Sequence, residues 1–415
     1  MASRGHHLVK SGRSFVNGSG LLSRLFARGF ARLIDQLHER LQVGGIDATL
    51  PDGSKRRVGF HAAGPVAVVH LKSWNALVRL ATSGSIGWYR AWAKGEWTSP
   101  DPVPLFELFM ANAVALGDAA RAKGSARLLN RFRHRRRDND LAGARDNIAA
   151  HYDLGNDFYA EWLDPSMTYS SARFEGSDDL EAAQHRKVAM LLDRLDLQPG
   201  QRLLEIGCGW GTLAIAAARR GVDVVGLTLS KEQKAWADAR VAEAGLSERV
   251  EIRLADYRET AGQFDAIASV EMVEAVGQRW WPAYMDCIAR NLKPGGRAAL
   301  QFISIDHRLF DAYSQSADFI QAYIFPGGML IDEPSFAALA AERGLSWQDR
   351  DGFGLDYAET LKQWRERYDT AVAGGRLPEF ASAFHDLWRY YLMYCEGGFR
   401  GRGIDVAQVT LVKAA

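Results

Sequence analysis

The stretch that decides the fold is GQRLLEIGCGWGTLAIAAARRGVDVVGLTLSKEQ, residues 200–233. A short apolar run, Arg202–Ile206, leads directly into a glycine-rich loop. The alanine-rich segment Thr212–Arg219 then stops before Gly221, where a left-handed helix cap is expected, and Val222–Leu227 is a second apolar run. The order strand, glycine loop, helix, strand predicts one βαβ unit with a ligand loop at the helix N-terminus.

The spacing of the glycines separates two cofactor classes. A dinucleotide site has G-x-G-x-x-G, followed about 20 residues later by an acid at the end of the second strand. Here the glycines are Gly207, Gly209 and Gly211, an acid at Glu205 precedes them, and the second strand ends at Thr228, Ser230 and Gln233 without a carboxylate. This pattern is similar to the S-adenosylmethionine (SAM) loop of class I methyltransferases. The alternative is a structural glycine turn in another α/β protein, and motifs elsewhere in the chain must decide.

Composition excludes several other classes of function. The 415 residues are enough for two domains, and a net charge of +1 gives no global reason to expect nucleic acid. The three cysteines, at 208, 287 and 395, form no metal pattern and suit a reducing compartment. No apolar run is long enough to span a membrane, and the basic N-terminus lacks the apolar core of a secretory signal. We therefore expect a cytoplasmic protein without a metal site.

Three segments are expected before the catalytic region. Residues 1–40 are basic, with apolar residues at helical spacing, which predicts an amphipathic helix that either lies on an anionic membrane or packs on its own domain. Residues 41–117 predict a small α+β domain, similar in outline to sterol-carrier modules, with an aromatic run at 84–97. Residues 118–147 predict a basic linker whose densest positive charge, at 131–137, attracts anionic headgroups. Within 41–117 the expected strands are 45–50, 57–62 and 67–71, and the expected helices are 73–83 and 104–112.

From residue 148 onward, motifs follow one another in a specific order. They are IAAHYDLGNDFY (148–159), MTYSSA (167–172), EIGCGWG (205–211), SVEMVEAVG (269–277), LKPGG (292–296), YIFPGG (323–328), FGLDY (353–357) and YLMYCEGGFR (391–400). This series resembles the cyclopropane-fatty-acid-phospholipid synthases and the mycolic acid cyclopropane synthases over roughly residues 148–412. The resemblance implies an α/β catalytic domain at 148–415 with the class I methyltransferase fold. Its doubly wound, mostly parallel sheet would span 185–415, with helical insertions at 306–345 and 355–400 covering the site.

The resemblance also implies a reaction and its partners. The methyl group of SAM would pass to a cis double bond in an acyl chain of a membrane phospholipid. Loss of a proton from the resulting carbocation to a bound bicarbonate ion would then close a cyclopropane ring. Aromatic faces can stabilise such a cation by about 2 kcal/mol each when desolvated. The enzyme would attach peripherally to the anionic inner face of the membrane, would not bind nucleic acid, and could work as a homodimer.

Site residues carried over from the family fall into two groups. On the SAM side are Tyr169 and Ser170 at the methionine part, Glu205, Gly207, Gly209 and Gly211 at its carboxylate and amino ends, Thr228 and Gln233 at the ribose, and Asp256 and Tyr257 at the adenine. On the catalytic side are Glu274, Tyr357, the backbone at Ile303, Ser171 and Gln301 around the bicarbonate. Ser171 stands where the best-known members have cysteine, and Gln301 where they have histidine. Both can hydrogen-bond an anion, but neither titrates near neutrality as histidine does.

These two replacements leave the product open. Some relatives make a methylene-branched acyl chain, after a hydride shift and a different deprotonation. A catalytically silent lipid-binding protein on the same scaffold is a second alternative, and the intact cofactor loop argues against it. A methyltransferase for a small hydrophilic or nucleic-acid substrate is a third, but the chain shows no base-reading or phosphate-binding motif.

Overall fold

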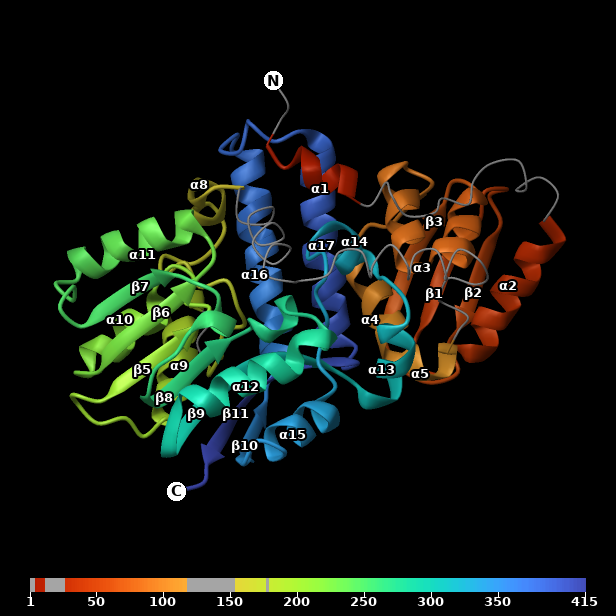
Figure 1. Cartoon of the computed structure of the whole chain (residues 1–415). Coiled ribbons are helices and arrows are strands. Elements are labelled where there is room, and N and C mark those ends of the chain that lie inside the picture. The colour runs from red at the N-terminus through yellow and green to blue at the C-terminus, as the bar shows by residue number, and fades with distance from the viewer. Residues whose placement is uncertain (1–3, 12–26, 118–153, 177–178) are drawn as a thin grey trace. The chain divides into compact units, whose positions relative to one another are not determined.

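The computed structural model describes residues 4–11, 27–117, 154–176 and 179–415 (Figure 1). The chain divides into two compact units. The first comprises Met1–Arg137, Arg308–Pro326 and Leu377–Ile404, and the second comprises Asp138–His307, Gly327–Arg376 and Asp405–Ala415. The expected linker at 118–147, its basic run at 131–137 and the motif residues 148–153 lie outside the described residues, as do 12–26.

The second unit is built on a seven-stranded sheet in the order β10-β11-β9-β8-β5-β6-β7. Its strands are β5 (Arg202–Ile206), β6 (Asp223–Thr228), β7 (Val250–Leu254), β8 (Phe264–Val270), β9 (Leu292–Ile305), β10 (Leu345–Gly352) and β11 (Ile404–Lys413). The five strands from β9 to β7 pair in parallel, and β10 pairs antiparallel with β11. The predicted doubly wound, mostly parallel α/β fold is confirmed.

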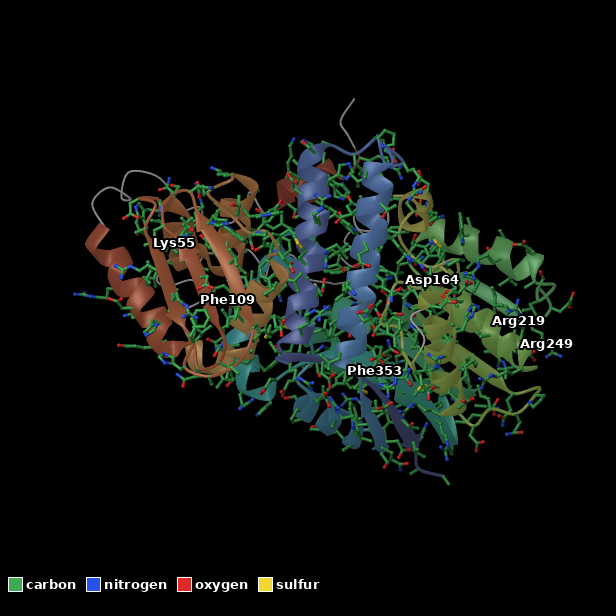
Figure 2. All side chains as sticks on the ribbon, turned by 180° about the vertical axis from the view of Figure 1, so that it is seen from behind. Lys55, Phe109, Asp164, Arg219, Arg249 and Phe353 are labelled. Atoms are coloured by element: carbon green, nitrogen blue, oxygen red, sulfur yellow. The ribbon has the colours of Figure 1, made fainter. Side chains whose placement is uncertain are left out.

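The helices of this unit are interspersed with its strands along the chain (Figure 1). They are α8 (Asn156–Ala160), α9 (Leu180–Asp193), α10 (Thr212–Arg219), α11 (Lys231–Glu243), α12 (Trp281–Asn291), α15 (Glu333–Ala341) and α16 (Gly354–Ala373). Helix α10 has the predicted bounds, and Gly221 after it has the expected positive φ of 82°. Figure 2 shows Arg219 and Arg249 on the outer surface of the unit, while Asp164 lies further inside and is buried.

The apolar core beneath the sheet follows from the sequence pattern of the βαβ unit. Leu203 of β5 and Val224 of β6 are buried against Ala214 and Ala217 of α10. Small alanine side chains let the helix approach the sheet closely, and the apolar strands are covered by packed side chains, as parallel strands require. The rigid sheet therefore presents the loops at the carboxyl ends of β5, β6, β7 and β8 along one edge.

The first unit contains a four-stranded sheet in the order β2-β1-β3-β4. Its strands are β1 (Gly45–Thr49), β2 (Lys55–Gly59), β3 (Val66–Leu71) and β4 (Trp97–Thr98). Its helices are α1 (His6–Ser11), α2 (Ala27–Arg40), α3 (Asn75–Ala93), α4 (Val103–Ala111), α5 (Ala113–Leu116), α14 (Phe319–Tyr323) and α17 (Ser382–Arg400), with most of α13 (His307–Ser314). The expected insertion at 355–400 is thus divided, with α16 in the second unit and α17 in the first.

Two elements of the first unit differ from the sequence-based expectation. The second strand was expected at 57–62 but ends at Gly59, because Gly59 and Phe60 have φ values of 85° and 69°. Left-handed backbone of this kind cannot continue a strand. The expected helix at 73–83 and the aromatic run form one helix, α3, which is kinked at Gly84 (φ 56°, ψ −138°).

The first unit has an apolar core of its own. Trp88 stacks on Trp97 with ring centroids 4.4 Å apart, and both are buried. Leu37, on the apolar face of α2, is buried and lines an apolar pocket with Phe109 and residues of β1–β3. This packing favours the expectation that the helix rests on its own domain. Among the described residues, no helix combines the length and apolar character needed to cross a membrane.

Candidate active site

The glycine loop joins β5 to α10 and faces open space on one side. Gly207, Gly209 and Gly211 have φ values of 85°, 51° and 86°. A Cβ atom added to Gly209 would meet no atom within 4 Å, whereas one on Gly207 would come within 2.8 Å of Cγ of Met272. The loop therefore leaves room for a ligand at Gly209 and packs at Gly207 against the segment that follows β8.

Glu205 occupies the end of β5 beside this loop. It is 3% exposed, and its Oε2 atom has no hydrogen-bond partner among the described residues. Burial raises the pKa of Glu205 to about 8. A buried carboxyl oxygen without a partner is costly, so it marks a position where a ligand donor such as an ammonium group would be accommodated.

Other residues expected on the SAM side lie at the ends of β6 and β7. Thr228 donates from Oγ1 to Oε1 of Gln233 at 2.8 Å. Asp256 accepts from the guanidinium of Arg258 at 2.7 Å, so its carboxylate already has a partner. The hydroxyl of the neighbouring Tyr257 is buried and has no partner among the described residues. Because these strands are parallel, all four predicted residues share the carboxyl edge of the sheet with the glycine loop.

Tyr169 lies among aromatic rings, whereas Ser170 contacts a buried lysine. The Tyr169 ring lies 5.4 Å from the ring of Trp162 and 5.3 Å from that of Trp364 on α16. Ser170 is buried, and its hydroxyl accepts a hydrogen bond from Nζ of Lys187. Burial lowers the pKa of Lys187 to about 8, while the negative charges of Glu271, Asp164 and Glu205 oppose this shift.

Glu271 is the centre of the catalytic group. Its Oε1 atom accepts from the backbone N–H of Ser171 at 2.9 Å and from Nε2 of Gln301 at 2.7 Å, and its Oε2 atom accepts from the hydroxyl of Tyr357 at 2.6 Å. Three residues expected to hold an anion thus converge on a carboxylate of the chain itself. The Ser171 hydroxyl is directed elsewhere and donates to the carbonyl of Ala172.

A chain of hydrogen bonds fixes the direction of these contacts. Nε of Arg194 donates to Oε1 of Gln408 at 3.2 Å, and Nε2 of Gln408 donates to Oε1 of Gln301 at 3.0 Å. The Nε2 atom of Gln301 is then the donor to Glu271. A guanidinium can only donate, so the orientation of both amides follows from it, and the chain ends on an oxygen of Glu271 that accepts.

The backbone of Glu271 is strained. Its φ is 47°, in the left-handed region that costs an ordinary residue about 1–2 kcal/mol. The backbone N–H of Glu271 donates to the carbonyl of Gln301 at 2.7 Å, which holds this conformation. Such strain persists where the surrounding structure determines the position of a side chain, as it does at functional sites.

Glu274 lies one turn further along the same segment. Its Oε1 atom accepts from the backbone N–H of Ile303, and its Oε2 atom is buried without a partner among the described residues. Burial, and next the charge of Glu271, raise the pKa of Glu274 to about 8. Burial also raises the pKa of Glu271, but Lys187 and its three donors oppose that shift. The two carboxyls therefore differ in their surroundings, with three donors on Glu271 and one on Glu274.

The bicarbonate ion that the resemblance implies does not fit this arrangement. The donors of Ser171, Gln301 and Tyr357 are directed at Glu271, and the N–H of Ile303 is directed at Glu274. A second anion about 4 Å from Glu271 would be repelled by roughly 4 kcal/mol at an effective dielectric constant of 20. Within the described residues, three or more side chains suited to a metal ion do not gather at one place either.

Sequence reasoning missed Glu271, Lys187 and Gln408, although two signals were available. Glu271 immediately follows the apolar segment that forms β8, in the motif where only Glu274 was singled out. Lys187 stands at helical spacing between Ala183 and Leu191, both fully buried, so it interrupts an apolar face of α9. A lysine at such a position indicates a buried charge with carboxylate partners.

Comparison with known proteins agrees with this geometry. Residues 139–409 match the family model described as mycolic acid cyclopropane synthetase. The chain is 40% identical over 345 residues to the tuberculostearic acid methyltransferase UfaA1 of Mycobacterium tuberculosis (strain ATCC 25618 / H37Rv), covering 81% of this chain and 80% of that protein. It is 35% identical over 376 residues to the cyclopropane-fatty-acyl-phospholipid synthase of Escherichia coli (strain K12), covering 86% of this chain and 90% of that protein.

The solved structures show the same fold. Mycolic acid cyclopropane synthase CmaA1, complexed with SAH and CTAB, superposes with a TM-score of 0.60 and 33% identity, over 65% of this chain and 98% of that one. The resemblance seen in the motifs from residue 148 onward is thereby confirmed. The chain belongs to the mycolic acid cyclopropane synthetase family and is a SAM-dependent methyltransferase of the cyclopropane-fatty-acyl-phospholipid synthase type.

Proposed function

We propose that this enzyme transfers a one-carbon unit from SAM to the cis double bond of an unsaturated phospholipid acyl chain, forming a cyclopropane ring. The observation that carries the proposal is the position of the Glu271 carboxylate, held by three donors beside the glycine loop and the ring of Tyr357. An acceptor of protons next to aromatic rings suits a reaction that passes through a carbocation. Relatives named for acyl-chain chemistry, 35–40% identical over more than four fifths of this chain, support it.

The chain's own residues would supply binding, positioning and a dry site. SAM contributes an electrophilic methyl group when it is bound at the glycine loop. Glu205 would accept from the cofactor's amino group, since its Oε2 atom lacks another partner. The rings of Tyr169 and Tyr357 both lie against Trp364, at centroid distances of 5.3 and 6.1 Å. Their faces would stabilise the cation, because an alkene is a weak nucleophile and the site must lower the energy of the charged state.

A branched product is the second candidate. The methyltransferase UfaA1, at 40% identity, is named for methyl transfer rather than for ring formation. The same first step, followed by a hydride shift and loss of a proton from the transferred carbon, would leave a methylene-branched chain. Glutamine at 301 in place of the family's histidine bears on this choice, because it changes the polar groups around the site of deprotonation.

Peripheral attachment to an anionic membrane would bring the enzyme to its lipid. Helix α2 supports this, since Arg32 is exposed there. The basic run at 131–137 would add to the attraction.

Lipid analysis of a host that expresses the chain tests the proposal. Cells fed methyl-deuterated methionine would be extracted and their phospholipid acyl chains analysed by mass spectrometry. A ring and a methylene branch both retain two deuterons of the transferred methyl group, so the label alone does not distinguish them. Ozonolysis does, because of these two products only the methylene-branched chain contains a double bond that it cleaves. Acyl chains that remain unlabelled would refute the proposed function.

A further inference from the structure

The contacts around Glu271 and Glu274 bear on which group accepts the proton that the carbocation loses. The proposed reaction produces a carbocation that must lose a proton, and the four donors expected to hold an external base are already engaged by carboxylates of the chain. Either those contacts break to admit an anion, or one of the two carboxylates is itself the base. The chemistry of Glu271 and Glu274 decides between these alternatives.

We infer that Glu271 is the catalytic base of this enzyme and occupies the place that an exogenous anion would otherwise take. The inference rests on the proposed function and names the group that accepts the proton. Three donors use three of the roughly four lone-pair positions of its carboxylate, and Oε2, with Tyr357 as its donor, retains one. Oε2 is therefore the atom that receives the proton.

Position supports this role. Glu271 is the first residue after β8, at the carboxyl edge where open α/β sheets bind their ligands. Its neighbour Met272 packs against Gly207, so Glu271 is tied to the loop that receives the cofactor. The left-handed backbone at Glu271 and the directed chain from Arg194 through Gln408 and Gln301 hold the carboxylate in one orientation.

The step balances without any further reactant. The alkene π electrons form a bond to the methyl carbon, and the electrons of the carbon–sulfur bond return to sulfur. A C–H bond of the transferred carbon then breaks, and its electron pair closes the ring. The proton moves to Oε2 of Glu271, which becomes a neutral carboxylic acid and returns the proton to water after the product leaves.

A carboxylate beside a cation could instead form an ester, and the three donors oppose this. Proton transfer requires only hydrogen-bond reach, about 2.6–3.2 Å between heavy atoms. Ester formation would require an oxygen to move to bonding distance. That movement would break contacts with Tyr357, Gln301 and Ser171, all of which are buried.

Glu274 is less suited to be the base. With its pKa at about 8 it is mostly protonated at neutral pH, and it has one donor against three for Glu271. In its protonated form Glu274 is uncharged, so it places no second negative charge near Glu271. The three donors that hold Glu271, against one for Glu274, assign the base to Glu271.

The experiment compares wild type with Glu271→Gln and Glu271→Gly, in buffer freed of carbon dioxide and then with added bicarbonate or formate. Wild type should turn over equally well with and without bicarbonate. Glu271→Gln should lose about 10²–10⁴-fold in kcat, as expected for a lost general base, while SAM binding by calorimetry stays close to wild type. Glu271→Gly relieves the backbone strain and leaves a carboxylate-sized space lined by three donors, so formate should restore part of its activity with saturation.

The matched control is Asp196→Asn. Asp196 is another acid with positive φ, at 51°, in the turn after α9, and this variant should keep full activity. Wild-type turnover that depends on bicarbonate, or near-full activity of Glu271→Gln, would overturn the inference. A wild type that labels no lipid bears instead on the proposed function. In that case, an alkene surfactant can serve as the acceptor, and consumption of SAM by Glu271→Gly is measured with and without formate. Restoration of this consumption by formate still tests the base.

Discussion

Replacing Gly209 with leucine separates the two jobs of the glycine loop, folding and cofactor binding. The backbone at Gly209 has φ 51°, which costs a residue with a Cβ about 1–2 kcal/mol. The structure adds no steric cost, since a Cβ there meets no protein atom within 4 Å. The free energy of unfolding of the apo-protein should therefore fall by only about 1–2 kcal/mol. The added side chain would project into the space that the cofactor needs.

Gly245→Leu is the matched control. Gly245, after α11, has φ 68° and the same open surroundings, but it lies away from the loop. Both variants should lose similar stability in urea unfolding. Only Gly209→Leu should lose SAM affinity, by at least about 100-fold, which corresponds to about 2.8 kcal/mol of binding free energy.

Calorimetric titration with SAM measures this affinity directly, and thermal unfolding with SAM gives a second reading. Cofactor at 100 times its dissociation constant adds about 2.7 kcal/mol to the stability of wild type and of Gly245→Leu. It should add almost nothing to Gly209→Leu. Binding of SAM by Gly209→Leu with wild-type affinity would refute the assignment of the loop.

Three further predictions concern ionisation and the membrane. Tyr357→Phe removes a donor that lowers the pKa of Glu271, so the acid limb of the kcat–pH profile should move to higher pH, and an unmoved limb would contradict this. The pKa of Glu274 is raised from its ordinary value of 4.5 to about 8 in the folded protein. The folded state therefore holds this proton more tightly than the unfolded chain does, and the resulting contribution to the free energy of unfolding is lost as the pH rises between these two values. Glu274→Gln should thus make the decline in urea stability from about pH 5 to about pH 8 shallower, and should lower kcat less than Glu271→Gln does. Binding to anionic vesicles should weaken as salt increases, and equal binding to neutral and anionic vesicles at every salt concentration would exclude the electrostatic contribution.

Much of the scaffold was predictable because it depends on local rules. The strand before the loop, the bounds of α10 and its cap at Gly221 follow from apolar periodicity and glycine positions. The end of β2 was not predictable, because Phe60 adopts a positive φ that a phenylalanine does not announce. The helical stretch that follows the kink at Gly84 within α3 was not predicted, because a glycine with non-helical backbone (φ 56°, ψ −138°) normally ends a helix.

The catalytic group was predictable in its members but not in its centre. Motif positions identified Ser171, Gln301 and Tyr357, and the structure brings all three together. Their common partner depends on the direction of the Glu271 side chain, which the left-handed backbone sets. Sequence indicates such a conformation for glycine but not for glutamate.

The place of β11 in the sheet has a consequence for how activity appears during folding. This strand follows the other strands in the chain, yet it inserts between β9 and β10 and carries Gln408. Before it inserts, Oε1 of Gln301 lacks its donor Gln408, so the chain that directs the Gln301 amide toward Glu271 is incomplete. Insertion of a late strand between earlier ones is a non-local event, which tends to be slow. Catalytic competence should therefore arise together with closure of the sheet, so that a partly folded intermediate already able to take up SAM would still be unable to complete turnover.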